Sequence, residues 1–417
     1  MNRKSYIFLN GLPAPVDVTG CPKIVDMFPE ILPYWPYETT SEPSDTPPFF
    51  IIRPHKAKPG YMVGSPYFDK PKPYPDEVNT LCALVAELAW EQLRNDPSLL
   101  CVHAAAVEIN GRLLLIPNKR RAGKSTLTAA LAANGYRVFT DDFLPLAVND
   151  KGQLCGVSCG IAPRLRLPLP DGFGDENAAF VQAHSGPSNP QYKYLELSSK
   201  NLASQGDMLP IGGIMVLNRD SENELKITSP EKADVLRALI SQNFAREMKS
   251  GGILRSLEFL VSNADCYELS YAEVGETLEL IKKTFASWQT PIARFDASKN
   301  IQDFQVADLN HKKSNNVIRF EAHQALQQSP GVTIRDMGAQ RFLSDRNGQA
   351  IHQLNETSAA IWQLLDEPTS LDELTEIFSQ AFPDNDADAM CQDILKTLKK
   401  MSRAGLVQLS KGAPHGN

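Results

Sequence analysis

A chain of 417 residues is long enough for about two or three hydrophobic cores. Its hydrophobic fraction of 42% and charged fraction of 22% are those of a globular protein and exclude a disordered one. A net charge of −7 and a pI of about 5.6 argue against a basic surface that binds nucleic acid or anionic membranes. Without a secretory signal or an apolar stretch of about 20 residues, we expect a cytoplasmic protein.

The first 75 residues are rich in proline, and aromatic and aliphatic residues such as Phe49–Ile52 lie between the prolines. This pattern predicts short strands with extended connections. The next segment, Asp76–Arg94, carries apolar residues at helical spacing. We therefore expect residues 1–95 to form a strand and helix region that packs on the core formed by the residues after it.

Two apolar runs, Leu100–Ile109 and Leu113–Ile116, come next. They flank Asn110-Gly111, a dipeptide that tolerates the positive φ angles of a two-residue hairpin turn. The sequence thus predicts a strand pair that leads the chain into Pro117.

The loop that follows, Asn118–Thr126, opens directly into a predicted helix that stops near Gly135. Backbone N–H groups at a helix start are unpaired and lie at the positive end of the helix dipole, so this loop can hold the phosphates of a nucleoside triphosphate. Its Gly-Lys-Ser-Thr end predicts that Lys124 reaches the outer phosphates and that Ser125 ligates magnesium.

The predicted strand Tyr136–Thr140 ends in Asp141-Asp142. Two carboxylates at a strand end suit phosphoryl transfer, in which one acid accepts the proton of the attacking hydroxyl and the other helps to hold a magnesium ion. Charge alone does not assign the two roles.

A histidine completes this set, because His103 lies 21 residues before Lys124 and Asp142 lies 18 residues after it. Together with the segments Val102-His103-Ala104, Gly123-Lys124-Ser125 and Asp141-Asp142, this spacing resembles the HPr kinase family and, more distantly, phosphoenolpyruvate carboxykinase. The resemblance implies an α/β P-loop core that uses ATP and Mg²⁺. It also implies these roles: His103 near the transferred phosphate, Lys124 on the phosphates, Ser125 on magnesium, and Asp142 as general base.

The predicted nucleotide-binding residues are Asn118, Arg121, Ala122, Gly123, Lys124, Ser125 and Thr126, and the predicted magnesium ligands are Ser125 and Asp141. The family loop normally carries glycine where this chain has Asn118 and Arg121, and arginine adopts left-handed backbone angles less readily than asparagine does. The cluster Lys119-Arg120-Arg121 therefore either distorts the loop or adds charge-assisted contacts to phosphate. The family's E-x-R-G segment has no match after Asp142, which predicts a kinase without the reverse phosphatase activity.

Several prolines predict a loop-rich segment between Asp150 and Gly212. It carries three cations that lie either near a substrate or on a solvated surface: Arg164, Arg166 and Lys193. The seven cysteines form no C-x-x-C pair, which favours reduced thiols over a zinc site.

After this segment, strands and helices alternate, as is typical of α/β packing on the core of the P-loop. The predicted elements are a strand at Ile211–Leu217, helices at Pro230–Lys249 and Gly252–Val261, a strand at Cys266–Leu269 and a helix at Val274–Phe285. We place the catalytic domain at residues 96–290 and a polar linker at residues 291–330.

The C-terminal segment begins with a hairpin signal, since Arg341–Leu354 alternates around Arg346-Asn347-Gly348. Three predicted helices follow, the first two capped by Asn355 and Ser370 and the third stopping at Gly405. A short strand at Leu406–Leu409 completes a winged-helix-like layout.

The motifs from Ile351 to Asp366 and from Ser402 to Val407 resemble the PqqD family over nearly its full length. We therefore expect a PqqD-like domain at residues 331–411. The resemblance implies that the leader of a ribosomally synthesised precursor peptide adds as a strand to the hairpin edge and packs against the third helix. Acidic residues match or outnumber basic ones over Glu356–Asp388, so we do not expect this domain to bind nucleic acid.

Together the two resemblances predict an ATP-dependent kinase that phosphorylates a Ser or Thr hydroxyl of a precursor peptide captured through its leader. Two alternatives stay open. The altered loop could leave a leader-binding scaffold without turnover, or phosphorylation could be an activation step before elimination or ring closure. HPr kinases often assemble through their core, so a homo-oligomer is among the expectations.

Overall fold

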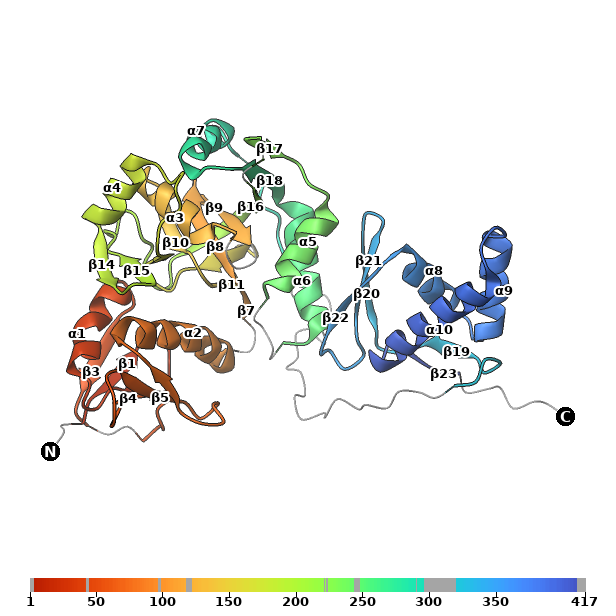
Figure 1. Ribbon diagram of the computed structural model, residues 1–417, viewed down its shortest axis with the longest axis horizontal. Coiled ribbons are helices and arrows are strands. Elements are labelled where there is room, and N and C mark those ends of the chain that lie inside the picture. Colours follow the sequence, from red (N-terminus) through yellow and green to blue (C-terminus); the bar gives the residue numbers. More distant parts are fainter. Residues whose placement is uncertain are drawn as a thin grey trace. The chain divides into compact units, whose positions relative to one another are not determined.

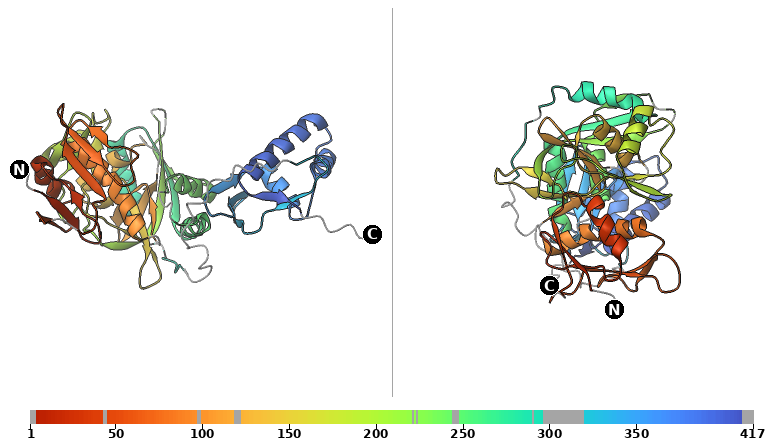
Figure 2. Two further views of the ribbon diagram at one scale, coloured as in Figure 1. Left: turned by 90° about the horizontal axis from the view of Figure 1, so that it is seen from below. Right: turned by 90° about the vertical axis from the view of Figure 1, so that its left-hand side faces the viewer.

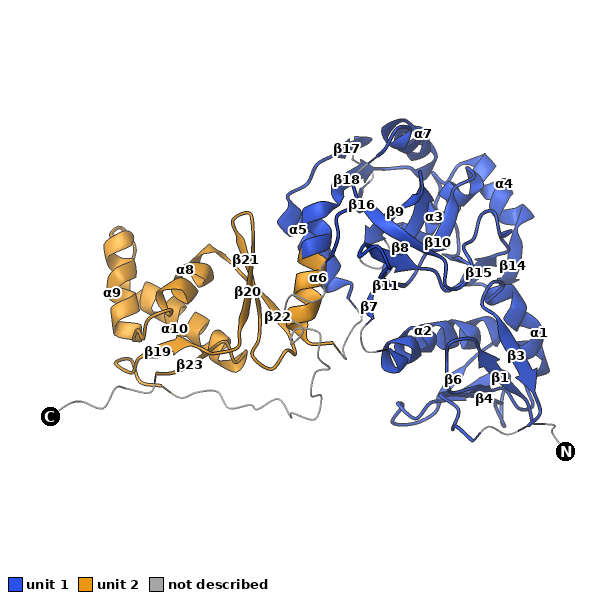
Figure 3. Ribbon diagram, turned by 180° about the vertical axis from the view of Figure 1, so that it is seen from behind, with its two compact units in different colours: residues 1–245, 259–296 blue, residues 246–258, 297–417 orange. Residues whose placement is uncertain are grey.

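The computed structural model describes residues 4–42, 45–96, 99–117, 122–220, 222, 224–243, 248–289, 291–295 and 320–410 (Figures 1 and 2). The chain divides into two compact units. The first holds residues 1–245 and 259–296, and the second holds residues 246–258 and 297–417 (Figure 3). Helices and sheets are mixed in both, which confirms the α/β class expected from the sequence.

The N-terminal part of the first unit is a six-stranded sheet in the order β3-β1-β2-β4-β5-β6 with two helices. Its elements are β1 (Tyr6–Leu9), β2 (Val16–Asp17), α1 (Pro22–Ile31), β3 (Tyr37–Thr40), β4 (Phe50–Pro54), β5 (Tyr61–Gly64), β6 (Lys72–Tyr74) and α2 (Glu77–Asn95). The helix predicted at Asp76–Arg94 is confirmed, and Asp76 caps it by accepting the N–H of Asn79. Helix α1 was not predicted, because Pro29 lies inside it.

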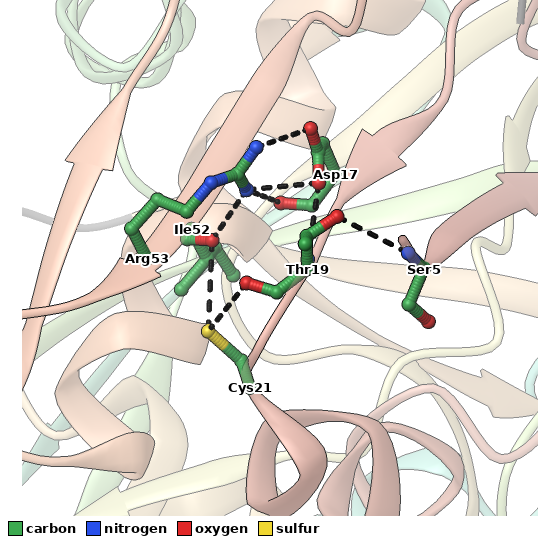
Figure 4. A network of polar contacts seen from close by, with 6 residues as sticks. All are labelled: Ser5, Asp17, Thr19, Cys21, Ile52 and Arg53. Carbon is green, nitrogen blue, oxygen red and sulfur yellow. Dashed lines mark hydrogen bonds and ion pairs between the residues drawn. The ribbon is translucent and has the colours of Figure 1, made fainter. Parts of the chain in front are cut away.

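An ion pair between Asp17 and Arg53 connects strands β2 and β4 of this sheet (Figure 4). Asp17 on β2 is only 6% exposed, and both of its carboxylate oxygens accept hydrogen bonds from Arg53 on β4. The backbone N–H of Thr19 also donates to it, at 3.0 Å. Burial alone would raise the pKa of Asp17, but the bonds from Arg53 and Thr19 outweigh burial and lower it.

The central sheet of the first unit has the order β10-β8-β9-β16-β12-β11-β7, with β18 beside β16 and β17 beside β18. Its strands are β7 (Leu100–Val102), β8 (Ala104–Ile109), β9 (Arg112–Pro117), β10 (Arg137–Thr140), β11 (Leu144–Val148), β12 (Leu154–Val157), β16 (Met208–Arg219), β17 (Lys226–Thr228) and β18 (Asp265–Tyr271). Strands β9, β16 and β18 run parallel, so their carboxyl ends lie at one edge of the sheet. The helices of this part are α3 (Lys124–Ala133), α5 (Lys232–Ser241) and α7 (Val274–Phe285).

The predicted hairpin is confirmed, because Asn110 and Gly111 have φ angles of 51° and 74° between β8 and β9. The predicted strand Leu100–Ile109 is wrong in one respect, since His103 interrupts it. Strands β7 and β8 pair antiparallel with β11 and β10. Next to the break the register is the same on both sides, since Val102 pairs with Leu144 and Ala106 pairs with Thr140. They therefore form one long strand pair that opens at His103 on one side and at Asp141–Phe143 on the other. Farther along, an irregularity between Val138 and Thr140 shifts the pairing of β10 with β8 by one residue.

The segment between Asp150 and Gly212 has the long connections that its prolines predict, but it also forms regular elements that were not predicted. Besides β12 and the start of β16, it forms a three-stranded sheet and a helix, namely β13 (Arg164–Arg166), α4 (Asp175–Ala183), β14 (Ser185–Ser188) and β15 (Tyr192–Leu195). The prolines are compatible with this sheet because Pro163 and Pro168 flank β13, and Pro187 lies on the edge strand β14.

In the second unit, strands β20 (Thr333–Met337), β21 (Gln340–Ser344) and β22 (Ile351–Leu354) form one sheet, and β19 (Leu326–Gln328) pairs with β23 (Val407–Leu409). Three helices, α8 (Glu356–Leu364), α9 (Leu371–Ala381) and α10 (Ala387–Arg403), enclose a core around Trp362 and Leu398. The predicted caps Asn355 and Ser370 are confirmed, and Ser370 forms a full capping box with Glu373.

Helix α6 (Ser250–Asn263) begins among residues of the second unit. The N–H of Ser250 donates to the carbonyl of Gly348 at 2.7 Å, and its hydroxyl lies 2.6 Å from that of Ser344. The helix predicted at Gly252–Val261 is thus confirmed. The one predicted at Pro230–Lys249 is too long, because α5 ends at Ser241.

We expect Asp17→Asn to lower the free energy of unfolding by about 2 kcal/mol at pH 7, less than for a fully buried pair because the Arg53 side chain is 40% exposed. The folded pKa of Asp17 lies below its unfolded value, so the stabilisation is present above about pH 4 and is lost as the pH falls through the folded pKa. Urea unfolding of both proteins at several pH values measures this. A difference that stays constant down to about pH 3 would contradict the assignment.

Candidate active site

The loop after β9 ends in a left-handed glycine that starts α3. Gly123 has a φ angle of 95°, and its carbonyl accepts the N–H of Leu127 at 2.8 Å. Of the predicted nucleotide-binding residues, the structure places Ala122, Gly123, Lys124, Ser125 and Thr126 at this helix start. Asn118 and Arg121 lie outside the described residues. Lys124 is only 7% exposed, so its charge is held against the protein interior.

The two predicted magnesium ligands are in contact. The Ser125 hydroxyl donates a hydrogen bond to the carboxylate of Asp141, and the backbone N–H of Arg164 donates to Asp141 Oδ2 at 3.2 Å. Asp141 is 7% exposed. Burial, and next the charge of Asp142, raise the pKa of Asp141 to about 6.

The surroundings of Asp142 shift its pKa in the direction opposite to that of Asp141. Its Oδ1 lies 3.0 Å from His103 Nε2, and its Oδ2 lies 3.5 Å from Arg164 Nη2. Burial alone would raise the pKa of Asp142, but the bond from His103 and the charges of Arg164, His103 and Lys124 outweigh burial and lower it. Asp142 is therefore ionised at neutral pH, and its side chain is 35% exposed.

The backbone brings His103 to this place. His103 lies in the break between β7 and β8, where its N–H donates to the carbonyl of Gln242 at 2.7 Å instead of to a strand partner. Asp142 lies in the matching break between β10 and β11. The breaks face each other, because the pair of Ala106 with Thr140 continues the register in which β7 pairs with β11.

The oxygens of Ser125 and Asp141 fit a magnesium ion. A buried carboxylate with a raised pKa gains from a neighbouring cation, and Mg²⁺ prefers oxygen ligands. Within the described ranges, no three His, Cys, Asp or Glu side chains converge as a metal cluster. Ser125 and Asp141 would hold the ion, and water and phosphate oxygens would supply its further ligands.

Arg164 is one of the three cations that the sequence left either near a substrate or on a solvated surface, and the structure places it beside the acids. It contacts both acids, through its backbone N–H and through its guanidinium, and it lies over the ring of Tyr192 at 4.9 Å. The contacts described for the other two cations of that segment are with groups other than the two acids. Arg166 is 5.6 Å from the same ring, and Lys193 bonds to Gln182. No local pattern distinguishes Arg164, because its place depends on the pairing of β13 with β15.

Two expectations drawn from composition can be compared with the structure. All seven cysteines are free, and burial raises the pKa of Cys155 to about 11 and of Cys159 to about 12. In the described part of the chain, no helix has the length and hydrophobicity of a membrane span.

Residues 341–407 match the protein family described as coenzyme PQQ synthesis protein D (PqqD). This match confirms the C-terminal PqqD-like domain expected from the sequence. Among solved structures, the chain is similar to the Hpr(Ser) kinase/phosphatase from Coxiella burnetii, with 14% identity and a TM-score of 0.22 over 44% of this chain and 91% of that chain. No curated protein matches the chain.

We expect Asp141→Asn to raise the free energy of unfolding by roughly 1–2 kcal/mol at pH 8 without divalent cations, because it removes a buried charge and keeps the acceptor oxygen. The folded pKa of about 6 lies above the unfolded value. The carboxyl therefore favours the folded state most below about pH 4, and this contribution is lost as the pH rises through 6.

Denaturant unfolding of both proteins at pH 8 and at about pH 4 measures this gain. The gain should become small at the lower pH, where the carboxyl is protonated in the folded state and about half protonated in the unfolded state. Equal stability of the two proteins at pH 8 would refute a buried ionised Asp141.

Proposed function

We propose that this chain is an ATP-dependent kinase that phosphorylates a Ser or Thr hydroxyl of a ribosomally synthesised precursor peptide. One observation carries the proposal. Two adjacent carboxylates interact with the start of α3: Asp141 accepts a hydrogen bond from Ser125, and the charge of Lys124 acts on Asp142. The pKa values of the two carboxylates are shifted in opposite directions. Such a pair suits a cation ligand and an ionised proton acceptor, the two acidic roles that phosphoryl transfer needs.

The residues at the start of α3 bind the phosphates of the nucleotide. Lys124 and the N–H groups from Gly123 onward bind the phosphate oxygens, which carry more negative charge in the transition state. Ser125 and Asp141 hold magnesium, which neutralises charge on the transferring group when it is bound.

Asp142 is the general base for the acceptor hydroxyl of the peptide. As the hydroxyl oxygen of the peptide forms its bond to the γ-phosphorus, the bond from that phosphorus to ADP breaks and the hydroxyl proton passes to Asp142. His103 and Arg164 each contact one oxygen of this carboxylate, so they fix its orientation and keep it ionised. The partial exposure of Asp142 gives a peptide hydroxyl access to it.

The match of residues 341–407 to PqqD supports a peptide as the substrate. Among the described residues, β22 pairs only with β21, so one side of β22 offers unpaired backbone groups to an added strand. Helix α10 buries Ile394 and Leu398 and exposes Lys396 and Lys399. A leader that adds to β22 and packs on α10 would use alternate side chains for register.

The leader-binding scaffold without turnover depended on Arg121, which lies outside the described residues, and no described contact favours it. The activation variant shares its first chemical step with simple phosphorylation. Both alternatives are therefore outcomes of one experiment.

The test is mass spectrometry of a candidate precursor peptide after incubation with the protein, ATP and Mg²⁺. We expect a leader-dependent gain of one phosphoryl group. Lys124→Ala and Asp142→Asn should each slow it by at least about 100-fold, because they remove phosphate binding and proton transfer. Lys226→Ala, on the exposed strand β17, is the matched control and should retain activity.

Leader affinity, measured by fluorescence anisotropy, should be unchanged in all three variants. Full turnover by Lys124→Ala would refute the kinase assignment. Tight leader binding with neither a mass change nor ATP consumption identifies the scaffold. Loss of water from the phosphorylated peptide identifies an activation step.

A further inference from the structure

A buried phenol lies against the phosphate loop and has no role in the chemistry above. Tyr271 is the last residue of β18 and is fully buried. Its hydroxyl donates a hydrogen bond to the carbonyl of Ala122, with 3.4 Å between the oxygens. Burial raises the pKa of Tyr271 to about 12, so the phenol remains a donor at neutral pH.

The same hydroxyl fills the space beside Gly123. A Cβ atom built on Gly123 would lie 2.5 Å from Tyr271 Oη, closer than real side chains approach each other. The φ angle of 95° independently favours glycine at this position. Any side chain at position 123 would therefore have to displace either the turn or the phenol.

The backbone around Tyr271 is held from the neighbouring strand. Tyr271 is the register partner of Arg219 on β16, and its carbonyl accepts the N–H of Asp220 at 3.2 Å. Arg219 Nε also donates to the carbonyl of Ala272 at 3.3 Å. The phenol is thus presented from a fixed strand end, at the edge of the sheet where β9 delivers the loop.

The hydrogen bond has a directional consequence. In a trans peptide, the C=O and the N–H point in opposite directions. A bond from Tyr271 to the carbonyl of Ala122 therefore turns the N–H of Gly123 away from the phenol. That N–H is one of the donors expected to meet phosphate.

We propose that Tyr271 is a positioning residue for phosphate binding: its hydroxyl fixes the Ala122–Gly123 peptide so that the N–H of Gly123 is aimed at the nucleotide. The inference rests on the proposed function, because Tyr271 can position the peptide for phosphate binding only if the loop binds a nucleotide. It adds a residue more than 140 positions away from the loop in the sequence, contributed by another strand.

The first test compares Tyr271→Phe with Tyr267→Phe by calorimetric titration of the full chain with MgATP. We expect Tyr271→Phe to weaken binding about fivefold, as for the loss of one hydrogen bond, and to raise KM more than it changes kcat. Tyr267 is the matched control, since it lies four residues earlier on the same strand and bonds to Asp265 instead. Tyr267→Phe should leave the affinity unchanged.

The second test uses Gly123→Ala, which we expect to weaken MgATP binding by at least about 20-fold through the clash and the left-handed φ angle. Adding Tyr271→Phe to Gly123→Ala removes the clashing oxygen, so it should improve the affinity. The same substitution thus acts in opposite directions in the two backgrounds.

A merely structural Tyr271 predicts a lower melting temperature for Tyr271→Phe in both backgrounds and no change in affinity, and that result would overturn the inference. If the unaltered protein binds MgATP and Tyr271→Phe binds it equally well, only this inference fails. If the unaltered protein binds no MgATP, the proposed function fails and takes the inference with it.

Discussion

The long antiparallel pair of β7–β8 with β10–β11 opens at one point, and the arrangement of the acids depends on that opening. An unbroken ladder would bind the backbone of His103 to the opposite strand. Instead, its N–H is bonded to Gln242, and the facing break frees Asp141 and Asp142 from pairing. Adjacent residues near a strand end project to opposite sides. Asp141 accordingly contacts Ser125, whereas Asp142 contacts His103, and this separation gives the two carboxyls different environments.

Arg164 links these acids to the rest of the first unit. Its strand, β13, belongs to the small sheet with β14 and β15. That sheet is tied to the N-terminal region, because Asn189 donates to the Asp76 carboxylate that caps α2, and Tyr194 lies 3.3 Å from Cys82. The proline-rich N-terminal region thereby supports the segment that holds Arg164. This region contributes no acidic or basic residue to the site, but it is connected to the site through these contacts.

The sequence predicted those turns, helix starts and helix caps that depend on residues close together in the chain. The turn at Asn110-Gly111, the start of α3 and the capped helices α8 and α9 each follow from residues within one or two turns of chain. Local signals could not distinguish Arg164 from Arg166 and Lys193, and they did not indicate Tyr271, because Arg164 and Tyr271 each reach the site through pairing between strands distant in the sequence. The spacing of His103, Lys124 and Asp142 singled out residues that the structure does bring together, but it did not reveal the break that positions His103.

The path of the chain between the two units limits how they can be separated. Residues 246–258 lie in the sequence between β16 and β18 of the first unit, yet they group with the second, so the chain passes between the units at three places. A fragment of residues 320–410 alone would lack Ser250, the partner of Gly348 and Ser344. The second unit is therefore formed by two separate stretches of the sequence. Exchange of this unit between chains would require residues 246–258 to move with it.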